Sequence, residues 1–212
     1  MSIAVTADII GSRELPDREG AQRRIDEVVA RVQADGPPAE RPLTPTVGDE
    51  LQGVYPDLPS ALAAILLIRL ALPDGVDLRF GVGAGTMGAV ASASGDIAEG
   101  PAWWAARDAI DTLHAKQVRS MPRVRTWIAA ADGATADAAS VALANAYAWT
   151  RDELVSGMSE RTRRLVYGRC VGRTQAELAE AEGITQSAVS QALTAAGAAA
   201  VVEGFRILQR PT

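Results

Sequence analysis

The sequence predicts an α+β fold, in which a ferredoxin-like β-α-β-β-α-β unit is followed by an all-α region. Two apolar runs, Ile3–Ile10 and Asp77–Ala84, are typical of strands because they are β-branched or alternate with small and polar residues. A Gly48-Asp49 turn between two short strand-like runs predicts a hairpin. From Asp137 onward the pattern is helical throughout.

The first half of the unit begins with the strand Ile3–Ile10. Asp17 can cap a helix over Arg18–Gln33, whose apolar residues recur at helical spacing. The Gly- and Pro-containing segment that follows is expected to be a loop. Hairpin strands are then expected near Pro45–Val47 and over Glu50–Tyr55.

The second half continues with a helix over Ser60–Leu72 that is apolar nearly all round, so we expect it to be buried. The strand Asp77–Ala84 follows, then a helix over Gly100–Ala115 and a last strand over Val124–Ile128. The glycines near Gly81 could approach phosphate or allow close packing. These elements divide the chain into two predicted domains, residues 1–132 and 133–212.

Composition restricts the class of protein. The 212 residues are 48% hydrophobic and 22% charged, which indicates a globular chain. The single cysteine, Cys170, allows no internal disulfide. The apolar run Ala61–Leu72 is too short for a membrane span, and the first residues lack the features of a signal peptide. We therefore expect a cytoplasmic protein without membrane contact.

Two acids are candidate metal ligands. Asp8 lies in an apolar strand, where an unpaired carboxylate would be costly, and Asp49 lies in the hairpin turn. In a ferredoxin-like sheet the first strand adjoins the hairpin, so the two side chains can converge. Oxygen ligands of this kind suit Mg²⁺ and, through it, phosphates. The alternative for Asp49 is an ordinary turn aspartate.

The helix after residue 100 contains Trp103 and Trp104. Adjacent helical residues point about 100° apart, so only one of them can be fully buried. The other is expected at a subunit interface or, alternatively, as a stacking surface for a base. His114 is expected to be a helix-end residue, not a ligand.

Residues 174–193 predict a helix-turn-helix. Thr174 and Glu177 form a capping box, Gly183 supplies the turn, and Thr185 caps a second helix. Short polar side chains on its outer face suit base edges and phosphates of double-stranded DNA. The expected DNA-binding residues are Arg173, Thr174, Thr185, Gln186, Ser187, Ser190 and Gln191.

Arginines near this motif could add phosphate contacts: Arg161, Arg163, Arg164, Arg169 and Arg173. The alternative is a helical hairpin used only for protein contacts. A single helix-turn-helix binds DNA weakly, so we expect a homodimer that contacts two half-sites.

Residues 3–115 resemble the catalytic domain of class III nucleotide cyclases, and more distantly the diguanylate cyclases. The stretches that resemble it are Ala7–Ser12, Thr46–Glu50, Phe80–Gly85 and Gly100–Arg107. The resemblance implies metal ligands at Asp8 and Asp49. It also implies nucleotide contacts at Ile9, Gly11, Ser12, Glu50, Trp104 and Arg107. The whole chain is similar to the SatD family, in which such a domain precedes a helix-turn-helix.

The sequence departs from the cyclase pattern at three places. Pro45 stands where cyclases have a base-reading lysine, and Trp104 where they have a ribose-orienting asparagine. Arg107 is one residue away from the position of the transition-state arginine. The metal acids are thus retained without the groups that support turnover.

These observations predict a DNA-binding transcriptional regulator whose first domain binds a metal–nucleotide ligand without turnover. One alternative is an active, divergent nucleotide cyclase or phosphoryl-transfer enzyme. A second is a protein–protein adaptor.

Overall fold

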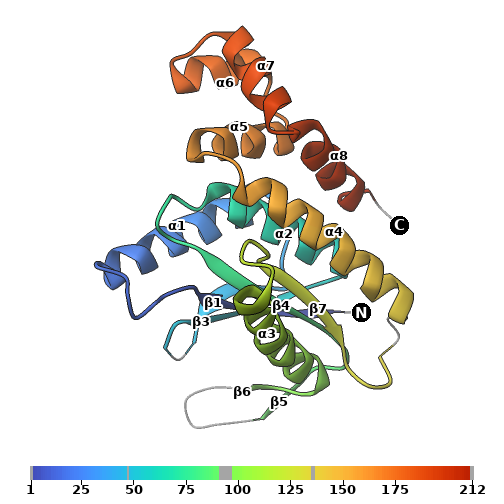
Figure 1. The fold of residues 1–212 in the computed structure, drawn as a ribbon. Coiled ribbons are helices and arrows are strands. Elements are labelled where there is room, and N and C mark those ends of the chain that lie inside the picture. The colour runs from blue at the N-terminus through green and yellow to red at the C-terminus, as the bar shows by residue number, and fades with distance from the viewer. Residues whose placement is uncertain (1, 47, 91–96, 135–136, 211–212) are drawn as a thin grey trace.

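The computed structural model describes residues 2–46, 48–90, 97–134 and 137–210. It confirms a mixed α+β fold with a five-stranded sheet (Figure 1). The strands are β1 (Ile3–Ile9), β2 (Arg41–Pro45), β3 (Glu50–Tyr55), β4 (Leu78–Ala84), β5 (Gly88–Val90), β6 (Ile97–Glu99) and β7 (Thr126–Ala130). The helices are α1 (Arg18–Asp35), α2 (Leu58–Ala71), α3 (Pro101–Arg119), α4 (Ala138–Ser156), α5 (Glu160–Cys170), α6 (Gln175–Glu182), α7 (Gln186–Ala195) and α8 (Ala198–Leu208).

The main sheet has the strand order β2-β3-β1-β4-β7. The central strand β1 runs antiparallel to β3 and β4, and β7 runs parallel to β4. In this register Asp8 of β1 lies opposite Glu50 of β3 on one side and Arg79 of β4 on the other. The sheet therefore brings together three charged residues that are far apart in the sequence.

The strand β2 lies where the sequence predicted a loop. Thr44 pairs with Gln52 across the hairpin, although the ladder is irregular toward the start of β2. Pro42 and Pro45 are tolerated because β2 is an edge strand, where a missing N–H removes no ladder hydrogen bond. The expected end of this strand at Val47 lies outside the described residues. The small β5–β6 pair was not predicted, since strands this short show no periodicity.

The two faces of the sheet differ because side chains alternate along each strand. From β1, Ile3, Val5 and Ile9 enter the large apolar core with α1 and α2. Ala4 instead packs with Trp103 of α3 on the opposite face. Helix α3 thus covers the face that also bears Asp8.

Two glycines of β4 let α3 lie directly on the sheet. A Cβ at Gly81 or Gly83 would come within 3.0 Å of the backbone oxygen of Ala106 or Ala102, closer than real Cβ atoms approach. Close helix packing is therefore what these glycines provide.

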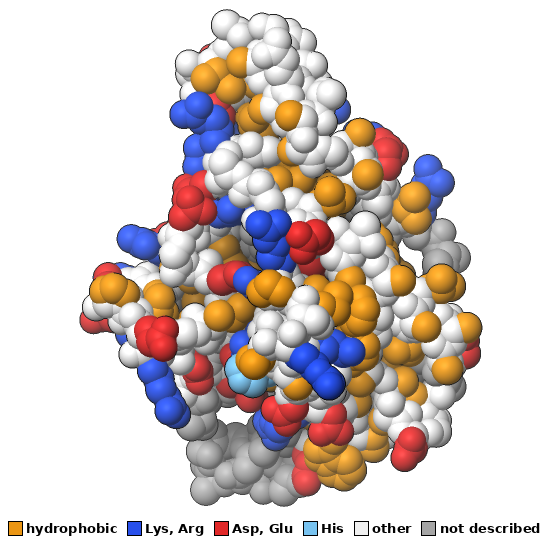
Figure 2. All heavy atoms as spheres, in the orientation of Figure 1, with side chains coloured by type: hydrophobic (Ala, Val, Ile, Leu, Met, Phe, Trp, Pro, Cys, Tyr) orange, Lys and Arg blue, Asp and Glu red, His pale blue; other side chains and the backbone are white. Residues whose placement is uncertain are grey.

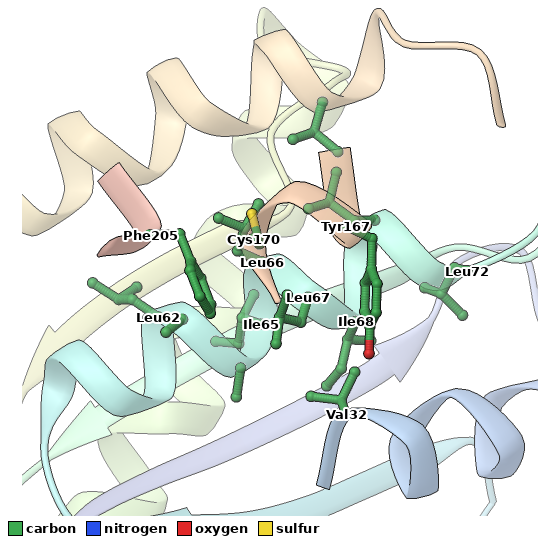
Figure 3. Packing of buried hydrophobic residues seen from close by; sticks show 14 of the residues in the cluster. Val32, Leu62, Ile65, Leu66, Leu67, Ile68, Leu72, Tyr167, Cys170 and Phe205 are labelled. Atoms are coloured by element: carbon green, nitrogen blue, oxygen red, sulfur yellow. The ribbon is translucent and has the colours of Figure 1, made fainter. Parts of the chain in front are cut away.

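Helix α2 is the centre of the core. Its residues from Ala61 to Leu70 are all buried, as its apolar composition predicted. Figure 3 shows Val32 of α1, Tyr167 and Cys170 of α5, and Phe205 of α8 around this helix. One apolar cluster thus extends from the sheet to the last helix and joins the two predicted domains, whose boundary at residue 132 stays a prediction.

A buried cluster of ion pairs links α4 to α2. Arg69 Nη1 donates to Asp152 Oδ1 at 2.6 Å, and Arg151 Nη2 donates to the same oxygen at 2.8 Å. The backbone N–H of Arg125 donates to Asp152 Oδ2 at 2.7 Å. Burial alone would raise the pKa of Asp152, but the two guanidiniums outweigh it and lower the pKa. The sequence analysis did not find this cluster.

A side chain of α4 also satisfies backbone groups at the free edge of β7. The Asn145 side chain accepts from the N–H of Ile128 and donates to its carbonyl, both at 2.9 Å. The amide thus takes the place of a neighbouring strand at this residue.

The helices α6 and α7 form a short pair at the end of the molecule farthest from the sheet (Figure 1). Thr174 and Glu177 make the predicted capping box, and Gly183 ends α6 with a left-handed backbone (φ 64°). Thr185 then caps α7 by accepting from the N–H of Ala188. The local signals for these two helices are confirmed.

No single helix within the described ranges is long and apolar enough to cross a membrane. α7 and α8 reach that length and composition only as a pair bent by 82°.

Candidate functional site

Asp8 lies at the end of β1 with one carboxylate oxygen fixed. Arg79 Nη1 donates to Asp8 Oδ2 at 2.7 Å. Arg79 is itself positioned by Gln117 of α3, whose Oε1 accepts from Arg79 Nε at 2.8 Å and whose Nε2 donates to the carbonyl of Val124 at 2.6 Å. The ion pair therefore has a defined orientation.

The other oxygen, Asp8 Oδ1, is buried and has no hydrogen-bond partner among the described residues. Burial raises the pKa of Asp8, and the negative charge of Asp49 raises it further, whereas Arg79 acts in the opposite direction. A buried acceptor without a donor is costly in an isolated protein. Its chemistry fits a cation, which would satisfy the free oxygen and relieve the repulsion.

The hairpin turn brings Asp49 into electrostatic range of Asp8. Gly48 makes this possible by adopting a left-handed backbone (φ 79°), and its carbonyl accepts from Arg18 of α1 at 3.3 Å. Glu50 Oε1 accepts from Gln52 Nε2 at 2.7 Å and from Arg107 Nη2 at 3.3 Å. Glu50 is therefore already engaged, whereas Asp8 Oδ1 has no donor in the described structure.

No set of three or more His, Cys, Asp and Glu side chains within the described residues could hold a metal ion unaided. Mg²⁺ commonly uses one or two carboxylates and takes its remaining ligands from water and substrate phosphates. The pair Asp8 and Asp49 fits that limited role. Mg²⁺ bound there would neutralise the carboxylates and offer open positions to phosphate oxygens.

The residues at the end of β1 and just after it, which the cyclase resemblance singled out, lie in different surroundings. Ile9 is buried in the apolar core, so its side chain does not face the acids. Gly11 forms the following turn with a left-handed backbone (φ 66°), and Ser12 is half-buried in that turn.

Helix α3 carries two of the residues expected to contact a nucleotide, Trp104 and Arg107, and they lie in different surroundings. Arg107 reaches Glu50, whereas Trp104 is 56% exposed and lines a cavity of about 350 Å³ with Ala130 and Asp132 beside β7. Asp8, Asp49 and Glu50 do not line that cavity. Trp104 is thus turned away from the acids, because the buried member of the pair is Trp103, at 6% exposed.

His114 is a residue that the sequence analysis set aside. Its charge lowers the pKa of Asp8, so it lies within electrostatic range of the candidate site. Arg79 and Gln117 were missed as well. The hydrogen bonds that link Gln117 to Arg79 and Arg79 to Asp8 form only in the folded protein. The sequence holds no local signal for them.

The outer face of α7 presents several of the predicted DNA-binding side chains. Gln186, Ser187 and Gln191 are exposed, while Ser190 is half-buried and lines a cavity of about 230 Å³ against α8. Thr174 and Thr185 are occupied as helix caps. Arg173 is exposed just before α6.

The sequence model described as the SatD family matches residues 2–202. The chain belongs to the SatD family. No curated protein matches the sequence.

Two solved structures of a bacterial light-regulated adenylyl cyclase resemble this SatD-family chain. The first has a TM-score of 0.43 and 16% identity, covering 60% of this chain and 74% of the cyclase chain. The second has a TM-score of 0.44 and 14% identity, covering 60% of this chain and 42% of the other. Similarity at this level does not establish a shared fold or activity.

The region around α6 and α7 of the SatD-family chain has few basic side chains for a DNA-binding surface. Residues 173–197 contain one basic and three acidic side chains. In Figure 2 this end of the molecule is mostly uncharged. Arg163 is paired with Asp74 at 2.9 Å, and Arg164 with Glu182 at 2.8 Å, so two of the expected phosphate contacts are engaged within the protein.

Proposed function

We propose that this SatD-family protein is a DNA-binding regulator whose sheet domain binds a Mg²⁺–nucleotide ligand without turnover. In this proposal residues 1–132 form a ferredoxin-like, cyclase-like domain and α6–α7 form a helix-turn-helix. Asp8 and Asp49 would hold Mg²⁺, and Arg107 would stand beside the phosphates. The protein would act as a homodimer on two DNA half-sites.

The observation that carries the ligand part is the buried, unpartnered Asp8 Oδ1 beside Asp49. Arg79 neutralises part of the charge at Asp8 but does not contact this oxygen. A site built only for structural stability would pair both oxygens. The free oxygen therefore supports a role in binding a cation.

Support for the DNA part is the tight connection between α6 and α7 and the short polar side chains on the outer face of α7. Gln186 and Gln191 can donate to and accept from base edges. Both are exposed, and neither side chain takes part in a hydrogen bond within the described protein.

Random duplexes selected on the full-length protein, with and without Mg²⁺–ATP, test this proposal. We expect enrichment of a two-fold symmetric sequence, with an affinity that changes when Mg²⁺–ATP is added. Asp49→Asn should keep DNA binding and lose the nucleotide effect, while Asp26→Asn at an exposed position of α1 is the matched control. Absence of any enriched duplex would overturn the DNA part.

The excess of acidic side chains in residues 173–197 favours a second candidate, a protein–protein adaptor. DNA affinity depends strongly on basic side chains that neutralise phosphates. An adaptor would bind no duplex even at low salt, whereas a DNA-binding protein would bind with an affinity that falls as salt rises.

A further inference from the structure

A further cavity, whose lining does not include Asp8, lies where α1, α2, α5 and α6 meet. Its volume is about 590 Å³, within the usual range of small-molecule sites. Leu70 of α2 and Leu178 of α6 contribute apolar surface to its wall. The rim is charged and includes Arg31 and Asp35 of α1 and Arg173 before α6. The cavity therefore combines an apolar wall with polar groups at its edge.

The acids of this rim are already engaged. Tyr167 Oη donates to Asp35 Oδ2 at 2.8 Å. Glu182 accepts from both Nε and Nη2 of Arg164, each at 2.8 Å. Glu182 is thus paired with Arg164, whereas Asp35 accepts from a neutral hydroxyl and keeps its negative charge.

The two remaining arginines of the cavity lack an ion pair in the described part of the chain. Within the described residues, the guanidiniums of Arg31 and Arg173 form no ion pair or hydrogen bond with a side chain. Arg31 lines the cavity together with Tyr167 and Asp35. The charge of Arg173 acts on Glu177, whose carboxylate is held by Thr174. Two free guanidiniums thus border one cavity.

Guanidiniums recognise phosphate oxygens through paired N–H donors, and an apolar wall suits a ring or carbon skeleton. We propose that this cavity binds a small phosphate monoester, whose phosphate contacts Arg31 and Arg173 and whose remaining part lies against Leu70 and Leu178. The site uses no carboxylate ligand, so its binding requires no metal. It does not rest on the Mg²⁺–nucleotide or DNA function proposed above.

Such a ligand would join two layers of the molecule. Arg31 belongs to the helix layer on the sheet, and Arg173 leads directly into α6. Leu178 of α6 packs against Gly168 of α5, where a side chain would leave no room for it. A bound phosphate monoester would therefore hold α6 and α7 in one orientation relative to α1.

Calorimetric titration of the full-length protein in EDTA tests the site with four probes: inorganic phosphate, ribose 5-phosphate, AMP and adenosine. We expect AMP and ribose 5-phosphate to bind and adenosine not to bind. Binding of inorganic phosphate alone would reassign the site to a free anion and overturn the monoester claim. Binding of AMP and adenosine with equal affinity would remove the role of the phosphate.

Variants locate the binding. Arg31→Gln and Arg173→Gln should each weaken AMP binding by about tenfold or more, because each removes a charge-assisted contact. Arg24→Gln, on the exposed side of the same helix α1, and Asp49→Asn should leave it unchanged. Retained affinity in both cavity variants, or loss in Asp49→Asn, would contradict the proposal. Since both substituted arginines are exposed, a thermal melt should show that all variants stay folded.

Discussion

Arg79 donates to one carboxylate oxygen of Asp8 at 2.7 Å from the adjacent strand, and the second oxygen of Asp8 is buried without a donor in the described structure. The pair is thus half satisfied. The sheet register sets Arg79 beside Asp8, and the negative charge of Asp49 in the hairpin turn opposes the effect of Arg79 on the pKa of Asp8. This asymmetry is what a bound cation would complete.

Mg²⁺ binding should weaken with acidification at a higher pH than for an ordinary aspartate. The folded pKa of Asp8 is raised, chiefly by burial, so its proton competes with the cation at a pH where a solvated aspartate is already ionised. Affinity should therefore be lost as pH falls through this raised pKa. Asp8→Asn should abolish both Mg²⁺ binding and its pH dependence, measured by titration at several pH values. Unchanged affinity in Asp8→Asn would exclude Asp8 as a ligand.

Asp152→Asn should destabilise the fold by about 3–5 kcal/mol, since it leaves Arg69 and Arg151 buried without their counter-ion. Urea unfolding measures the change in the free energy of unfolding. The exposed control Asp26→Asn should stay within about 0.5 kcal/mol of the unsubstituted protein. A destabilisation below about 1 kcal/mol would show that the cluster is not a principal link between α2 and α4.

The lowered pKa of Asp152 also predicts how the stability of the fold depends on pH. Because the folded pKa of Asp152 is lowered, its stabilising contribution is complete above the pKa of an unfolded aspartate and is lost as pH falls through the folded value. The unsubstituted protein should begin to lose this stability at the usual aspartate pKa and lose it fully below the lowered folded value. Asp152→Asn should show no such step when unfolding is followed over acidic pH.

Gly83→Ala should destabilise the protein by about 1–3 kcal/mol, because the added methyl would overlap the backbone of α3 at Ala102. Gly88→Ala is the matched control, since its nearest non-neighbouring atom lies at 3.6 Å, an ordinary contact. Thermal unfolding should rank the two variants in that order. Equal stability would mean that α3 can move off the sheet at little cost.

Replacing both Gln186 and Gln191 by Ala should reduce discrimination for the selected DNA sequence, by about 1–3 kcal/mol for each glutamine that forms a bidentate pair with a base. The affinity for unrelated duplexes should change little, because these side chains carry no charge. Gln33→Ala at an exposed position of α1 controls for surface changes. Fluorescence anisotropy at two salt concentrations measures both quantities, and equal discrimination before and after substitution would remove α7 from the DNA interface.

Local signals in the sequence predicted most elements but few of the contacts between them. The capping box at Thr174 and the apolar run of α2 depend on neighbouring residues, so both could be found. The first hairpin strand was predicted near Pro45–Val47, whereas β2 begins at Arg41, because its prolines resemble a loop unless its edge position is known. The α+β class could therefore be predicted, while the edge of the sheet could not.

The candidate site shows the same limit. Asp8 was conspicuous because an acid in an apolar strand needs an explanation. Its partner Arg79 lies 71 residues away, and Arg69 and Asp152 are 83 residues apart, so no local pattern links them. Trp104 was expected near the nucleotide, but the rotation of α3 gives the inward position to Trp103.

The most direct test is calorimetric titration of Mg²⁺–ATP and Mg²⁺–GTP into the full-length protein and Asp49→Asn, with the reaction mixture then analysed for products. The account predicts a Mg²⁺-dependent component of binding that is absent in Asp49→Asn, with the nucleotide recovered unchanged. Binding of equal strength in Asp49→Asn would contradict the acidic site. Conversion of the nucleotide by the unsubstituted protein, abolished in Asp49→Asn, would contradict binding without turnover and assign an enzyme instead.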